Sequence, residues 1–161
     1  MKKTKMNITL ESLRSNPLVI TVWQIAGVVL FYLILGTYWL KDYSKVQIFA
    51  YMIMGLFISL FVHELVHCMF MRFFSKKKIT IGCKRIRGSI GYCYVELHDK
   101  LKRWQSTIVK LSPVVSLTVV PTIVMLLSGY RSAFSYAFVM LNFNSSYLDF
   151  IDTIILWQKE A

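Results

Sequence analysis

Two histidines and one glutamate near the middle of the chain are spaced for metal chemistry. Residues 63 to 67 read His-Glu-Leu-Val-His. On a helix, this HExxH spacing places the two imidazoles one turn apart on the same face, with Glu64 projecting beside them. Imidazole nitrogens bind Zn²⁺, and a carboxylate next to the metal can accept a proton from water. The pattern therefore predicts hydrolysis at a zinc site, with His63 and His67 as metal ligands and Glu64 as the general base.

The residues around this motif are apolar on both sides. Gly-Leu-Phe-Ile-Ser-Leu-Phe-Val precedes it and Cys-Met-Phe-Met-Arg-Phe-Phe follows it, so the motif lies within a predicted membrane span. A plainer interpretation is a pair of buried helix histidines beside an unrelated glutamate. Ionisable side chains in a lipid-embedded helix are costly unless they have a function. We therefore expect a site that cuts peptide bonds at the membrane.

A third protein ligand is expected, because catalytic zinc sites use three protein ligands and one water. His67 and Asp149 lie seven and eight residues before the ends of their apolar segments. At 1.5 Å per residue these positions are about 10 and 12 Å from one membrane face, so the two side chains can meet. Asp149 is the predicted ligand, and Asp152 is predicted to support the site from about 4.5 Å nearer the surface. The alternatives are a helix-packing hydrogen bond, or a segment that lies partly outside the bilayer.

The segment that contains these aspartates has a polar face. Asn142, Ser145, Asp149 and Asp152 follow one another at intervals of three, four and three residues. Such residues share one face of a helix, and in a membrane that face must be turned toward protein or water. Asn142 and Asn144 are the candidate donors to the oxyanion that forms during peptide hydrolysis.

Composition indicates what must hold these residues in place. The chain has 161 residues, of which 56% are hydrophobic, and one domain is expected at this length. A soluble protein of this size has too little interior to bury so much apolar surface. Four apolar stretches approach the length that crosses about 30 Å of hydrocarbon. We expect an all-α membrane protein with four transmembrane helices, at residues 18–40, 47–74, 107–128 and 133–157.

Residues 1–17 are expected to be a cytoplasmic lead-in to the first helix, at 18–40. The loop 75–106 contains two stretches rich in β-branched and aromatic residues, separated by Gly88 and Ser89. This pattern favours a β-hairpin between the second and third helices, with an irregular loop as the alternative.

Charge predicts the orientation in the membrane. The formal net charge is +11, and most lysines and arginines lie before the first helix or within the loop 75–106. The positive-inside rule places both termini and this loop in the cytoplasm. Because the charge follows topology, we expect no nucleic-acid partner. The cluster Lys76–Lys78 is expected to contact anionic lipid headgroups.

An HExxH span, a cytoplasmic hairpin, a second span and an Asp-bearing third span resemble the core of the site-2 protease family of intramembrane zinc metalloproteases. The chain is more similar still to the short bacterial "putative zincin peptidase" membrane proteins. Their Asn-x-x-x-Ser-x-x-Asp pattern is matched by Asn142, Ser146 and Asp149. The resemblance covers roughly residues 50–157. It implies that 18–40 is an additional N-terminal transmembrane helix and that 47–157 is the membrane-embedded metalloprotease core. It also implies a Zn²⁺ cofactor, a bacterial cell membrane and Ser146 as a further site residue. One departure is Phe150, where site-2 proteases have glycine after the aspartate.

Together these observations predict an intramembrane zinc metalloprotease that cleaves membrane-protein substrates near the cytoplasmic face. A regulatory membrane partner is compatible with this prediction. The alternative is a zinc- or ion-binding membrane protein without protease activity, such as a small transporter or an accessory or immunity-type factor. Substitution of Glu64 distinguishes them, because only a hydrolase requires a general base.

Overall fold

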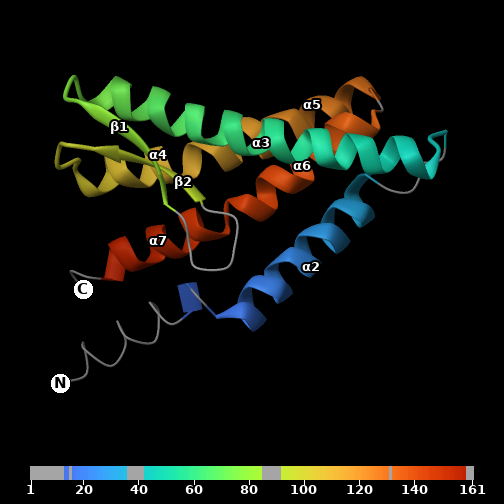
Figure 1. The fold of residues 1–161 in the computed structure, drawn as a ribbon, viewed down its shortest axis with the longest axis horizontal. Helices are drawn as coiled ribbons and strands as arrows, with labels where there is room; N and C mark the ends of the chain where they lie inside the picture. Colours follow the sequence, from blue (N-terminus) through green and yellow to red (C-terminus); the bar gives the residue numbers. More distant parts are fainter. Residues whose placement is uncertain (1–12, 15, 36–41, 85–91, 131, 159–161) are drawn as a thin grey trace.

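The computed structural model describes residues 13–14, 16–35, 42–84, 92–130 and 132–158. Long helices dominate, and one two-stranded sheet lies beside them (Figure 1). The elements are α2 (Pro17–Leu35), α3 (Lys45–Phe74), β1 (Ile79–Lys84), β2 (Tyr92–Leu97), α4 (Arg103–Val114), the π-helical turn η2 (Val115–Val119), α5 (Val120–Ser128), α6 (Ala133–Ser145) and α7 (Tyr147–Gln158).

Helix α3, which contains the HExxH motif, begins at a capping box. Ser44 accepts a hydrogen bond from the backbone N–H of Gln47, and the Gln47 side chain accepts one from the backbone N–H of Ser44. This exchange satisfies N–H groups that the first turn of a helix leaves unpaired. The helix runs for 30 residues to Phe74, about 45 Å. The predicted span 47–74 is therefore observed, extended by two residues.

Among the described residues, three helices are long and apolar enough to cross a membrane: Pro17–Ile34, Lys45–Phe74 and the continuous run Arg103–Ser128. The expected four transmembrane helices are not confirmed within the part of the chain that the structure describes. The predicted fourth span, 133–157, consists of α6 and α7, which have 13 and 12 residues. Each is well short of the roughly 20 residues that cross the hydrocarbon core.

Serine side chains account for the break between α6 and α7. The hydroxyls of Ser145 and Ser146 both donate to the carbonyl oxygen of Asn142, each at 2.8 Å. The backbone N–H of Ser146 also donates to that carbonyl, at 3.1 Å, and to the carbonyl oxygen of Phe143, at 3.2 Å. Serine hydroxyls that bond back to a helix carbonyl compete with the regular ladder and bend the helix. The sequence contained this signal in its Ser-Ser pair.

The helix run from Arg103 to Ser128 contains two irregularities. Pro113 lies inside α4, and the π turn η2 follows it at once. The run starts four residues before the predicted position, because the Gln105 side chain accepts a hydrogen bond from the backbone N–H of Lys102 at 2.8 Å. It ends at Gly129, whose φ of 67° is the left-handed conformation that glycine adopts readily.

The strands β1 and β2 pair antiparallel, with Ile79 opposite Leu97 and Lys84 opposite Tyr92. They correspond to the two predicted strands, while the predicted turn at Gly88 and Ser89 lies outside the described residues. At the base of the sheet, Asp99 accepts hydrogen bonds from the Ser75 hydroxyl at 2.6 Å and from the Lys77 ammonium at 3.0 Å. These two bonds hold the pKa of Asp99 below its usual value and join the sheet to the end of α3.

Helix α6 packs along α3 and is covered by α2 on its other side (Figure 1). Gly55 of α3 lets the two backbones approach, since a Cβ there would meet Ala137 at 3.3 Å. Trp23 of α2 stacks on Phe143 of α6 with ring centroids 5.0 Å apart. A Cβ at Gly27 of α2 would collide with the Asn144 amide. Helix α2 therefore supports the segment just before the α6–α7 break.

The outer faces of the long helices are apolar. Leu33 of α2, Phe57 of α3 and Leu127 of α5 are 73, 69 and 84% exposed. Large exposed apolar faces on helices whose backbone groups are satisfied internally suit a lipid environment. The helices are therefore consistent with membrane association.

Candidate metal centre

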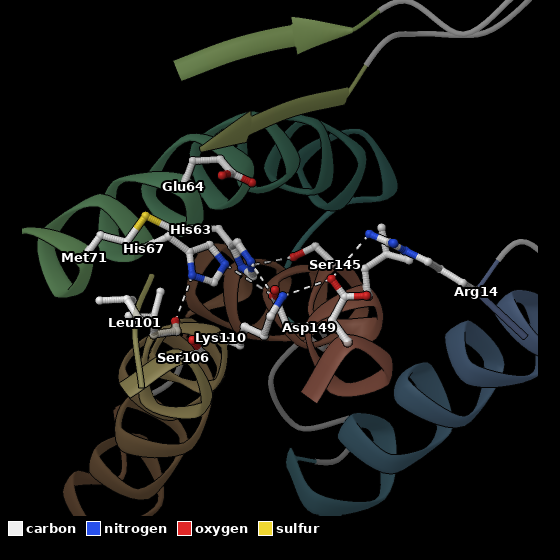
Figure 2. A pocket seen from close by; sticks show the side chains of 13 residues that line it. Arg14, His63, Glu64, His67, Met71, Leu101, Ser106, Lys110, Ser145 and Asp149 are labelled. Carbon is white, nitrogen blue, oxygen red and sulfur yellow. Dashed lines mark hydrogen bonds and ion pairs between the residues drawn. The ribbon is translucent and has the colours of Figure 1, made fainter. Parts of the chain in front are cut away.

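Three side chains with metal-binding atoms converge between α3 and α7. The Nε2 atom of His63 lies 2.9 Å from Oδ2 of Asp149, and Nε2 of His67 lies 3.4 Å from the same oxygen. Their ligand atoms all lie within 4.8 Å of one another. Figure 2 shows both imidazoles directed from α3 toward Asp149. The structure thus brings together the three residues that the sequence indicated as metal ligands.

The orientation of His63 is fixed by a buried amide. Its Nδ1 lies 2.9 Å from Oδ1 of Asn142, a side chain with no exposed surface. The amide nitrogen of Asn142 donates to the carbonyl of Pro113 at 3.1 Å and to the hydroxyl of Thr118 at 2.8 Å. Since these acceptors hold the nitrogen, the amide oxygen faces His63 and accepts from its Nδ1–H. The Nε2 lone pair of His63 is then directed at Asp149.

The orientation of His67 is fixed by the backbone. Its Nδ1 lies 2.8 Å from the carbonyl oxygen of Val109 in α4. A carbonyl can only accept, so Nδ1 carries the hydrogen and the Nε2 lone pair points away from α4, toward Asp149. Histidines that bind metals regularly donate their other ring N–H to such an acceptor, which fixes the tautomer and the ring orientation.

These donor atoms fit zinc. Two imidazole lone pairs and one carboxylate oxygen meet at one point, and such an arrangement is repulsive unless a proton or a cation lies between them. Both histidines are buried, with side chains 6 and 9% exposed, and Asp149 is 16% exposed. Two nitrogen ligands and one oxygen ligand are a set that catalytic zinc sites use. His63, His67 and Asp149 would hold the ion.

Glu64 lies next to this centre on α3. Figure 2 shows its carboxylate on the side of the imidazoles nearest the strands, with Asp149 on the other side. Within the described part of the chain, no hydrogen bond or ion pair occupies the Glu64 oxygens. Glu64 is one of the residues that line the same cavity as the two histidines. Glu64 therefore shares a cavity with the three candidate ligands without being paired to any of them in the described residues.

The cavity has a volume of about 340 Å³ and lies between α3, α4 and the α6–α7 segment. Besides the three ligand candidates and Glu64, its polar side chains are those of Arg14, Ser106, Lys110, Ser145 and Asp152. This volume lies at the lower end of the range of ligand pockets, about 300–1,000 Å³.

Asp152 does not join the imidazoles. Its Oδ2 accepts from Lys110 at 2.9 Å and from Arg14 at 3.3 Å. Sequence reasoning did not select these two cations. Lys110 had a clear signal, because it is the one charged residue within the apolar stretch 107–128. Arg14 had none, because its approach to Asp152 depends on the fold.

The remaining predicted residues are distributed around the site. Ser145 lines the cavity and lies 3.5 Å from Nδ1 of His63. Ser146 is buried and its hydroxyl bonds the carbonyl of Asn142. Asn144 does not line the cavity, and its buried amide oxygen finds no partner in the described residues. The amide of Asn142 is used in its hydrogen bonds to His63, Pro113 and Thr118, and Asn142 does not line the cavity. Neither predicted oxyanion donor therefore faces the cavity.

The chain matches the model of the family described as "Putative zincin peptidase" over residues 56–161. It belongs to this family, which indicates a zinc metallopeptidase. The match includes α6 and α7 as well as the HExxH motif, whereas α2 lies outside it. Comparisons with curated proteins and with solved structures gave no match.

Proposed function

We propose that this member of the zincin peptidase family is an intramembrane metalloprotease that cleaves membrane-protein substrates near the cytoplasmic face of the bilayer. The observation that carries the proposal is that Asp149 of α7 meets His63 and His67, which lie together with Glu64 on α3, a helix long enough to cross a membrane. A zinc site on a soluble domain would be reached from water. Here the histidines lie on the helix that also presents an apolar outer face.

Each residue has a defined role in this proposal. His63, His67 and Asp149 hold a zinc ion, which when bound polarises the scissile carbonyl and makes water more acidic. Glu64 accepts the proton of the attacking water and returns it to the leaving amine. Its free oxygens and its position beside the imidazoles support this role.

The developing oxyanion needs a further donor, and the cavity limits the choice. The side-chain donors that line it are those of Arg14, Ser106, Lys110 and Ser145, whereas Asn142 and Asn144 do not line it. We assign the oxyanion contact to Lys110, whose side chain is 30% exposed and whose ammonium lies 2.9 Å from Oδ2 of Asp152. A charged donor aimed at developing negative charge is worth most where water is excluded.

A helical substrate must unwind before cleavage, because its peptide bonds are occupied by its own hydrogen bonds. The β1–β2 sheet lies beside α3 on the Glu64 side of the centre (Figure 2). An unwound segment adding as a further strand would gain backbone hydrogen bonds there. Such a strand would lie on the same side of α3 as Glu64.

The charge distribution supports the rest of the proposal. The cytoplasmic side would hold both termini, the sheet and the Lys76–Lys78 cluster, which would contact anionic lipid headgroups. The setting would be a bacterial cell membrane, and a membrane partner could regulate access.

The test is the variant Glu64→Gln, which keeps the size of the side chain and removes the base. We expect zinc content to be unchanged and cleavage of a co-expressed single-span reporter, with Gly or Pro in its helix, to fall by about 10²–10⁴-fold. Asp42→Asn is the matched control, because it changes an exposed carboxylate to an amide outside the cavity, just before α3 begins. Undiminished cleavage by Glu64→Gln with zinc bound would refute the mechanism. Zinc binding without cleavage of any membrane substrate by the wild type would favour a metal-binding protein instead.

A further inference from the structure

Pro113 changes the hydrogen bonding of the helix that faces the metal centre. In a regular α-helix, the carbonyl of residue 109 accepts from the backbone N–H of residue 113. Proline has no N–H, so this bond cannot form. The Val109 carbonyl is the oxygen that accepts from Nδ1 of His67, at 2.8 Å. The carbonyl oxygen that lacks its regular helix donor is therefore the same atom that accepts from His67.

The number of lone pairs on that carbonyl makes the proline matter. A carbonyl oxygen has two lone pairs. On Val109 they are used by His67 and by the hydroxyl of Ser112, each at 2.8 Å. A backbone N–H at position 113 would be a third donor for two acceptor sites. This N–H would be the donor that a regular α-helix directs at the carbonyl four residues earlier, which here is that of Val109.

A second irregularity of the same helix serves His63. The π turn η2 begins two residues after Pro113, and π turns shift the regular hydrogen-bond ladder. The carbonyl of Pro113 and the hydroxyl of Thr118 are the two acceptors that hold the Asn142 amide. The Thr118 hydroxyl itself donates to the carbonyl of Val139 at 3.4 Å, so it accepts from Asn142. One interrupted helix thus orients both imidazoles.

We propose that Pro113 is a positioning residue of the metal centre, which keeps a lone pair of the Val109 carbonyl free to orient His67. The inference rests on the proposed metal site, and it assigns to Pro113 and the π turn a role beyond helix geometry. Pro113 itself touches neither the cavity nor the candidate ligands; it acts through the carbonyl of Val109.

The experiment compares Pro113→Ala with Pro121→Ala in the full-length, detergent-solubilised protein. Both changes remove a proline from the helix run 103–128, but only the first restores a donor to Val109. Zinc affinity is measured by competition with a chromophoric chelator. We expect Pro113→Ala to bind zinc about 10- to 100-fold more weakly, the range for lost support of a metal ligand. Pro121→Ala should match the wild type.

A measurement of the unfolding of the metal-free protein separates a loss of zinc affinity from damage to the fold. Alanine is a far better helix former than proline, so the secondary structure of Pro113→Ala should be preserved. The double variant Ser112→Ala/Pro113→Ala removes the hydroxyl donor and returns the carbonyl to two donors. It should recover most of the lost affinity. Recovery is not expected if Pro113→Ala acts only by leaving a cavity.

Each result decides between the alternatives. Equal zinc affinity in Pro113→Ala and wild type would overturn the inference, and so would equal losses in the Pro113 and Pro121 variants. If Pro113→Ala does not fold, the ¹⁵N chemical shifts of the zinc-loaded wild type decide: a hydrogen on Nδ1 of His67 supports the inference, and metal on Nδ1 overturns it. Absence of zinc binding by the wild type would instead refute the proposed function.

Discussion

Asn142 is the side chain whose loss should disturb this protein most without touching the metal or the cavity. It makes three buried hydrogen bonds, to Nδ1 of His63 and to the Pro113 carbonyl and Thr118 hydroxyl. Asn142→Ala removes all three. A bond between membrane helices is worth about 0.6 kcal/mol on average, and a typical buried bond in a soluble protein about 1 kcal/mol. The free energy of unfolding should therefore fall by about 2 to 3 kcal/mol.

The same change should weaken zinc binding, because His63 loses the acceptor that fixes its ring. We expect the dissociation constant for zinc to rise by about 10- to 100-fold. Asn144→Ala is the matched control: it removes the same group two residues away, where the amide oxygen has no partner in the described residues. Its unfolding free energy should change by less than about 1 kcal/mol, and its zinc affinity should not change.

The assays are reversible unfolding of the detergent-solubilised protein and chelator competition for zinc. Equal effects of the two asparagine substitutions would show that the hydrogen bonds of Asn142 carry no special weight. A larger effect from Asn144 would show that contact with α2, and not support of His63, is the function of this segment.

Three further predictions concern the ligand, the first helix and the orientation. Asp149→Ala should lower the zinc content of the purified protein. Asp152→Ala should lower it less, because Asp152 pairs with Lys110 and Arg14. Equal zinc occupancy in the wild type and in Asp149→Ala would remove Asp149 from the ligand set. Gly27→Leu should force α2 away from Asn144 and lower the unfolding free energy by about 1–3 kcal/mol. Val28→Leu, on the exposed face of α2, should leave the unfolding free energy unchanged. Similar unfolding free energies for the two variants would mean that α2 is not closely packed against α6. A cysteine at position 89 should be labelled by an impermeant thiol reagent only after permeabilisation, and labelling of intact cells would invert the proposed topology.

Local pattern was sufficient for much of this protein. The HExxH spacing placed His63 and His67 on one helix face because helical periodicity depends only on distance along the chain. Three of the long helices followed from the length of apolar runs, and the strands β1 and β2 from β-branched and aromatic residues. Depth along two helices was enough to indicate Asp149 beside His67, because both positions were counted from the ends of their apolar segments.

The tertiary structure decided the hydrogen-bond and ion-pair partners of the site residues, because these partners have no signature in the sequence. The acceptor for His67 is a backbone carbonyl, which every residue has, and only the packing of α4 on α3 selects that of Val109. The pairing of Asp152 with Lys110 and Arg14 joins three distant segments. Sequence determined which side chains could bind a metal, because that is a property of residue type and helical spacing. Their orientation was decided by the fold, because it depends on hydrogen bonds between helices that the sequence does not place side by side.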